Sequence, residues 1–148
     1  MQSLKALGVG LICAAICSAE PAAAQTETQA EPKGFVCAFA SGTSSSYENG
    51  TFKVKPPVEL NFEIADIDLE GQTAHLVADG QKKAGALKIV RAINANHYLE
   101  VVNEGFLNLT TIYDKDASTG RHPAVHSRHL GVLGQPVFAQ YAGFCTEK

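Results

Sequence analysis

Apolar residues recur in short runs from Gly34 to the end of the chain, and Gly, Asn, Asp or Pro residues separate the runs. This punctuation is typical of β-strands joined by tight turns. No long segment has the 3.6-residue period of an amphipathic helix, and only Gln81–Leu87 favours a short one. We therefore expect an all-β antiparallel meander of about eight strands. The predicted strands are "GFVCAFA", "VELNFEI", "QTAHLVA", "GALKIVRAI", "HYLEVVN", "FLNLTTIYD", "PAVHSRHLGV" and "QPVFAQYAGFC".

The segment "VELNFEI" shows the strand alternation most clearly, because every second residue of 58–64 is apolar. These apolar residues share one face of a strand, and the intervening polar residues share the other. Ile67 and Leu69 have the opposite parity, so we expect a β-bulge near Ala65 and Asp66.

The first 24 residues have the order of a secretory signal peptide. Lys5 is followed by an apolar run over residues 6–16 and then by small residues that end in "PAAA". Cleavage is expected between Ala24 and Gln25, and the apolar run is too short to anchor the chain in a membrane. Residues 25–33, "QTETQAEPK", are polar and aperiodic, so we expect a flexible leader before the domain. The mature protein is then periplasmic or secreted.

Four cysteines are present, and two of them, Cys13 and Cys17, lie in the predicted signal peptide. Each follows an isoleucine, where a lipidation signal would need a small residue, so no lipid anchor is expected. Cleavage leaves Cys37 and Cys145, one near each end of the mature domain. In an oxidising compartment such a pair predicts a disulfide. A disulfide holds the two Cα atoms within about 7 Å, so the first and last strands should be neighbours.

A meander whose terminal strands are joined in this way predicts a closed barrel, because closure removes the unpaired edges of an open sheet. We expect residues 34–148 to form one small barrel that is similar in plan to the calycins and lipocalins. The alternative is a two-layer β-sandwich with the disulfide between its sheets. Eight strands enclose either a packed core or room for one small ligand, and the sequence leaves both open.

The chain has 12 basic and 15 acidic side chains, which gives a net charge of −3. Removing residues 1–24 leaves this balance unchanged, because one basic and one acidic residue are lost. The basic residues are scattered, and tryptophan is absent. A weakly acidic surface of this kind gives no electrostatic reason to expect nucleic acid or an anionic membrane as a partner.

The segment "HPAVHSRH", residues 122–129, contains three of the five histidines. On a helix, His122, His126 and His129 would share one face as a metal site. On a strand the period is two, so His122, His126 and Arg128 share one face. Poor helix formers in the segment favour the strand. We expect this face to point outward, where His126 and Arg128 pair with carboxylates of neighbouring strands. The candidate carboxylates are Glu59, Glu63 and Glu100.

A weaker alternative is a metal site in which His122 and His126 are joined by His75 or His97 from a neighbouring strand. Ser127 is not surrounded by the G-x-S-x-G elbow of a serine hydrolase, and adjacent residues on a strand point to opposite faces. We therefore expect no catalytic residues, no cofactor and no metal.

Residues 124–145, "AVHSRHLGVLGQPVFAQYAGFC", resemble the C-terminal part of small exported proteobacterial proteins of unassigned function, with the pattern AVHSRHxGxLGxPxxxQYxGxC. "GFVCAFASG", residues 34–42, is a weaker match to the same proteins. The resemblance implies a secreted or periplasmic domain and supplies no catalytic residues. The chain is also loosely similar in plan to periplasmic lysozyme inhibitors, which are small barrels tied by a disulfide. "SGTSSSY", residues 41–47, is loosely similar to their "SGxxY" element.

Three classes of function follow from these observations. The first is a non-enzymatic binding module that holds a small apolar ligand in the barrel or a periplasmic protein through its loops. Its candidate contacts are Tyr47, Arg121, His126 and Arg128. The second is an inhibitor of a secreted hydrolase that uses a predicted loop, "SGTSSSYENG", residues 41–50. The third is a histidine-based metal-binding protein. The sequence favours the first class, because it contains no recognisable catalytic motif, and it leaves the oligomeric state open.

Overall fold

A computed structural model describes residues 31–78, 81–102, 106–132 and 134–148. The predicted signal peptide, residues 1–24, lies outside the described residues, as does the leader up to residue 30. Within the described part, no helix is long and apolar enough to cross a membrane. The described elements are all β-strands, which confirms the predicted fold class.

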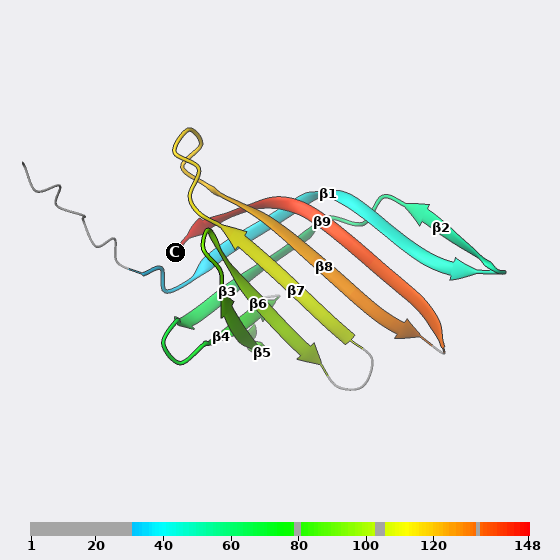
Figure 1. Cartoon of the computed structure of the whole chain (residues 1–148), viewed down its shortest axis with the longest axis horizontal. Coiled ribbons are helices and arrows are strands. Elements are labelled where there is room, and N and C mark those ends of the chain that lie inside the picture. Colours follow the sequence, from blue (N-terminus) through cyan, green and yellow to red (C-terminus); the bar gives the residue numbers. More distant parts are fainter. Residues whose placement is uncertain (1–30, 79–80, 103–105, 133) are drawn as a thin grey trace, which may run out of the picture. The chain divides into compact units, whose positions relative to one another are not determined.

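Nine strands follow one another within the described residues (Figure 1). All hydrogen-bonded neighbours are antiparallel. The strand that the sequence pattern did not predict is β2. The bounds are β1 Phe35–Glu48, β2 Thr51–Lys55, β3 Leu60–Asp68, β4 Thr73–Ala78, β5 Gln81–Arg91, β6 Ala95–Val102, β7 Phe106–Tyr113, β8 His122–Val132 and β9 Gln135–Glu147.

The prediction of a short helix at Gln81–Leu87 is wrong, because these residues belong to β5. Strand β5 pairs with β4 on one side and with β6 on the other. Leu87 and Ile89 are buried whereas Lys88 and Val90 are exposed, which is the alternation of a strand. Residues 81–88 pair with β4, and residues 88–91 pair with β6. Pairing with β4 therefore overrides the helix propensity of the Gln, Lys and Ala residues in this segment.

The sheet closes on itself. Each strand from β3 to β8 pairs with the next, β9 returns to pair with β1, and β1 pairs with β3. Strands β1 and β3 to β9 therefore form a ring, whereas β2 pairs with β1 alone among the described strands. The closed barrel is confirmed, and the alternative of a sandwich does not apply.

Strand β1 changes its partner part-way along its length. Residues 35–39 pair with β3, and residues 44–48 pair with β2. The register with β9 shifts between Phe39 and Ser41, so a bulge separates the two halves. Strands β1, β2, β8 and β9 extend together at the end where the β1–β2 and β8–β9 turns lie (Figure 1). We call this end the hairpin end, and the opposite end, which holds the chain's cysteine pair, the disulfide end.

The predicted loop over residues 41–50 is wrong for most of its length, because residues 41–48 continue β1. Only Asn49 and Gly50 form the connection to β2. Both have positive φ, at 51° and 80°. A two-residue type I′ turn requires this conformation, and the Asn-Gly dipeptide is its preferred sequence.

The Cys37–Cys145 disulfide is present as predicted. The two residues lie directly opposite each other in the β1–β9 ladder, with their Cα atoms 4.1 Å apart. Both side chains are buried. The first and last strands of the ring are therefore neighbours, as the cysteine spacing predicted.

The barrel interior at the disulfide end is filled mainly by apolar side chains. Phe39 stacks on Phe62 with ring centroids 5.4 Å apart. The bulge predicted near residues 65 and 66 is confirmed, because the register between β3 and β4 shifts within residues 65–68. This shift lets Ile64 and Ile67 both point into the core despite their opposite parity.

Close approach of β1 and β9 makes Gly143 a sensitive position. A Cβ atom there would overlap the Ala38 carbonyl oxygen and would lie 2.7 Å from the Phe39 Cα atom. Backbone atoms cannot move aside as the end of a flexible side chain can. We expect Gly143→Ala to lower the free energy of unfolding by about 1 to 3 kcal/mol, measured by urea denaturation.

Gly131 supplies a matched control for this prediction. It also lies in a strand, and a Cβ atom there would meet nothing within 4 Å. Gly131→Ala should change the free energy of unfolding by less than about 0.5 kcal/mol. Equal effects of the two substitutions would contradict the close approach of β1 and β9 at Gly143.

Candidate functional site

Two rows of polar side chains cross the inner face of the barrel toward the hairpin end. Residues directly opposite each other in paired strands share one face, so the registers of β6 to β9 define the rows. The first polar row consists of Tyr98, Thr110, His126 and Tyr141. The second polar row, one step nearer the hairpin end, consists of Glu100, Asn108 and Arg128.

The shared face of His122, His126 and Arg128 was predicted correctly, but its outward direction was wrong. His122 and His126 are buried, with 8% and 4% exposure, and Arg128 is half-buried. The face points inward because it is continuous with the buried Ala124 and Tyr141. The expected pairing with outward carboxylates is replaced by contacts inside the barrel.

His126 is a neutral hydrogen-bonded side chain in the first polar row. Its Nε2 accepts a hydrogen bond from Arg128 Nε at 3.2 Å, so the ring proton lies on Nδ1, 2.8 Å from Thr110 Oγ1. Burial, followed by the nearby Arg128 charge, lowers the pKa of His126 to about 4. The rings of Phe62 and Tyr141 lie within 6 Å of the imidazole centroid. With both nitrogens engaged, His126 positions Arg128 and offers no free lone pair to a metal.

Glu100 and Asn108 form a second hydrogen-bonded pair. Glu100 is only 6% exposed, and Asn108 Nδ2 donates to its Oε2 at 2.7 Å. Glu100 Oε1 lies against Gly85 of β5, where a Cβ atom would overlap it. Gly85 therefore makes room for the carboxylate. The Asn108 amide nitrogen thus faces Glu100, and its Oδ1 points elsewhere.

Two buried polar atoms in these rows have no hydrogen-bond partner among the described residues. They are the Tyr98 hydroxyl and Asn108 Oδ1. Burial raises the pKa of Tyr98 to about 12, so its hydroxyl stays protonated and can donate. An unpaired buried group of this kind costs about 1 to 3 kcal/mol. The rows thus contain one unused donor and one unused acceptor.

Arg128 is the cationic group of this region. Its guanidinium lies 5.7 Å from the centroid of the Tyr141 ring, and it forms no ion pair with any residue that the structure describes. The next row toward the hairpin end is apolar and consists of Phe106, Leu130 and Val137. Phe106 is 45% exposed, and the other two are half-buried. A cation therefore borders an accessible apolar surface on the inner face.

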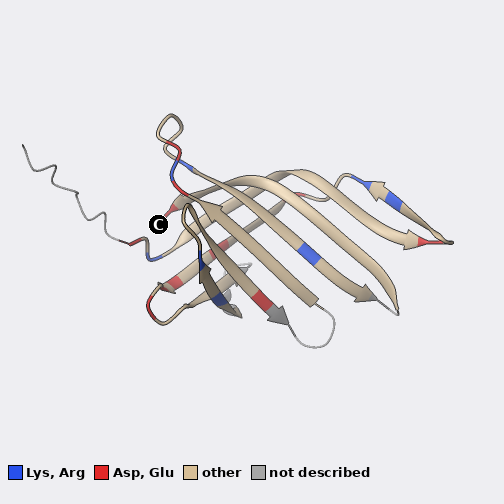
Figure 2. Cartoon of the chain, viewed as in Figure 1, with Lys and Arg blue, Asp and Glu red and all other residues tan. Residues whose placement is uncertain are grey.

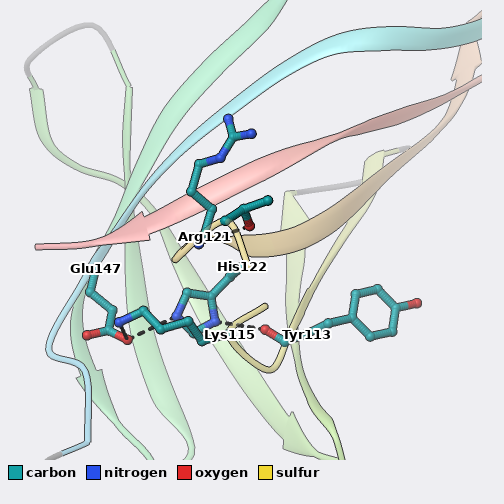
Figure 3. Close-up of polar contacts among 6 residues, drawn as sticks. Tyr113, Lys115, Arg121, His122 and Glu147 are labelled. Carbon is teal, nitrogen blue, oxygen red and sulfur yellow. Dashed lines mark hydrogen bonds and ion pairs between the residues drawn. The ribbon is translucent and has the colours of Figure 1, made fainter. Parts of the chain in front are cut away.

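His122 has a structural role at the disulfide end (Figure 3). Its Nδ1 lies 2.8 Å from the Tyr113 carbonyl oxygen, and its Nε2 lies 2.9 Å from Glu147 Oε1. Lys115 Nζ contacts the same carboxylate oxygen at 3.0 Å. The hydrogen bond from His122, with that from Lys115, holds the pKa of Glu147 below its ordinary value. These contacts tie the end of β7 and the start of β8 to the C-terminal strand.

The four histidines of the metal alternative do not meet. His75 and His97 have the opposite strand parity to the buried Ala74 and Tyr98, so both lie on the outer face. His75 Nδ1 lies 3.5 Å from Asp66 Oδ2, but the two atoms form no hydrogen bond. His97 Nδ1 lies 2.9 Å from Thr111 Oγ1, within hydrogen-bond distance. Within the described ranges, no group of three or more His, Cys, Asp or Glu side chains could hold a metal ion.

Of the four predicted contact residues, only His126 and Arg128 come together. Tyr47 packs beside Phe52, with ring centroids 5.1 Å apart, in the extended part of β1 and β2. The Arg121 guanidinium lies 4.0 Å from the centroid of the Phe144 ring at the disulfide end. Sequence reasoning named Glu100 only as an outward carboxylate, whereas its side chain is buried inside the barrel. It missed Tyr98 and Asn108.

Comparisons of the chain with protein-family models, with curated proteins and with solved structures found no match. The resemblance of residues 124–145 to small exported proteins therefore stays a prediction. The geometry of the polar rows carries the functional argument.

Proposed function

We propose that the chain is a non-enzymatic binding protein of the periplasm or the extracellular medium. Its ligand is a small amphipathic molecule with a carboxylate head group, which binds on the inner face at the hairpin end. The observation that carries this proposal is Arg128, a half-buried cation without an ion pair among the described residues, next to an apolar row.

The second polar row supports recognition of a carboxylate. An arginine guanidinium can donate two parallel hydrogen bonds to a carboxylate, and such charge-assisted bonds are stronger than neutral ones. The hydrogen bond to His126 fixes Arg128 Nε and so orients the guanidinium. Glu100 lies two strand spacings from Arg128, about 10 Å along the row, with Asn108 between them. Asn108 Oδ1 can accept from a donor on the same ligand.

The apolar row supports an apolar body next to that head group. Phe106, Leu130 and Val137 occupy adjacent strands on the same inner face as Arg128. Covering apolar area on these side chains contributes roughly 25 cal/mol per Å². The neutral His126, with both nitrogens engaged, supports binding rather than acid–base catalysis.

The test is calorimetric titration of the mature protein with octanoate and with 1-octanol, which has the same apolar body without the charge. We expect octanoate to bind more tightly than octanol. Arg128→Gln should weaken octanoate binding by about 10- to 100-fold, because a charge-assisted hydrogen-bonded pair is lost. The same substitution should leave octanol binding nearly unchanged.

Arg121→Gln is the matched control, because Arg121 contacts the Phe144 ring at the disulfide end. It should leave octanoate binding unchanged. If octanoate does not bind, or if both arginine substitutions weaken it equally, the proposed site is wrong.

A further inference from the structure

Strand β2 has one edge that is not paired with any described strand. It pairs with β1 through its other edge, and all five of its residues are exposed. Figure 1 shows β2 at the margin of the extended sheet of the hairpin end. An unpaired edge presents backbone donors and acceptors to which another extended chain can bind.

The free edge presents the backbone groups of Phe52 and Val54. Glu48 and Thr51 flank the two-residue turn and therefore form a hydrogen-bonded pair. Hydrogen-bonded and non-hydrogen-bonded pairs alternate along an antiparallel ladder. Thr51, Lys53 and Lys55 thus bond to β1, and the N–H and C=O groups of Phe52 and Val54 point away from it.

The two faces of β2 differ in chemistry. Phe52 and Val54 are 54% and 67% exposed on the outer face, where Phe52 lies 5.1 Å from the Tyr47 ring and 5.8 Å from the Phe138 ring. Lys53 and Lys55 occupy the other face and are both exposed. Figure 2 shows these basic positions on β2, and neither lysine forms an ion pair with a described residue.

This pattern disfavours a second copy of the chain as the occupant. In any register of two paired β2 strands, each lysine meets a lysine, a threonine or an apolar side chain, because β2 contains no acidic residue. Like charges directly opposite each other in a sheet are destabilising. A strand that places carboxylates opposite Lys53 and Lys55 gains attractive cross-strand pairs on that face instead.

We propose that the β2 edge binds an extended segment of a partner protein in which acidic and apolar residues alternate. The partner backbone pairs with Phe52 and Val54, its acidic side chains meet the lysines, and its apolar side chains extend the aromatic cluster of Tyr47, Phe52 and Phe138. Lys53 and Lys55 share the inner face with Arg128, and the register places Lys55 three strands away from it. The free backbone edge and the outer-face aromatic cluster lie apart from Arg128, so this site adds a protein partner to the small ligand.

The test uses two fluorescein-labelled hexapeptides, one with three Glu-Val repeats and one with three Lys-Val repeats, measured by fluorescence anisotropy. The unmodified protein should bind the Glu-Val peptide and not the Lys-Val peptide. The double variant Lys53→Glu and Lys55→Glu should reverse this preference. The affinity for each peptide should change by at least about tenfold. The far-ultraviolet circular dichroism spectrum of the double variant should match that of the unmodified protein, which reports correct folding.

Val54→Pro tests the backbone pairing directly. It removes an N–H group that faces the free edge, and proline is tolerated at such a position of an edge strand. Val54→Pro should weaken binding of the Glu-Val peptide by roughly tenfold. Val54→Thr keeps the N–H group and should not weaken binding. Equal binding by these two variants would overturn the proposal. So would an unreversed charge preference, or self-association that Val54→Pro abolishes.

Discussion

Replacement of both Cys37 and Cys145 by alanine is expected to lower the free energy of unfolding by about 4 to 5 kcal/mol. The disulfide joins residues 108 positions apart, and a cross-link of this length strongly restricts the unfolded chain. Both cysteines are buried directly opposite each other in β1 and β9, so their replacement also removes a packed contact between these two strands. Urea denaturation of the two proteins measures the difference.

A reducing agent provides the control for this effect. Dithiothreitol should destabilise the unmodified protein by a similar amount and should leave the double alanine variant unchanged. If the free energy of unfolding of the variant fell by less than about 1 kcal/mol, closure of the barrel would not depend on the cross-link. The fold would then rely on the strand ladders alone.

The unfolding free energy should also fall by roughly 3 kcal/mol because of His126 as the pH is lowered from 7 to 4. His126 has a pKa of about 4 in the folded protein, against 6.5 in an unfolded chain. Between pH 4 and pH 6.5 the imidazole is mostly protonated in the unfolded state and mostly neutral in the folded state. The stability from neutral His126 is therefore fully present above pH 6.5 and is lost as the pH falls toward 4.

Comparison of two histidine variants isolates this effect from other groups that titrate in acid. His126→Gln cannot titrate, so it should lack about 3 kcal/mol of the acid-induced loss. His129→Gln, at an exposed position of the same strand, should retain the full loss. Urea denaturation at pH 7, 5.5 and 4 measures all three proteins. Parallel pH profiles for His126→Gln and the unmodified protein would contradict a buried neutral imidazole.

Much of the fold was predictable because it depends on local patterns. Alternation in residues 58–64, the Gly, Asn, Asp and Pro residues between the apolar runs and the spacing of two cysteines led to a closed antiparallel ring. Strand β2 was missed because its five residues include two lysines and precede two prolines, which weakens the strand signal. The helix predicted at Gln81–Leu87 failed because the helix propensity of this segment does not include its pairing with β4.

The candidate site was only partly predictable from the sequence. Parity placed His126 and Arg128 on one face of β8, but both faces of that strand mix polar and apolar residues, so parity did not say which face points inward. Glu100 and Asn108 join Arg128 through the registers of β6, β7 and β8. Register depends on pairing between strands, which no single segment encodes.

Mapping of octanoate by NMR tests the central claim most directly. The claim is that the inner face at the hairpin end, with Arg128 in the second polar row, is a carboxylate site. Titration of the isotope-labelled protein should shift the Arg128 Nε–H signal and the side-chain signals of Tyr98, Asn108 and Leu130, with little change at Arg121. Shifts confined to the disulfide end or the outer face, with Arg128 unmoved, would contradict the claim.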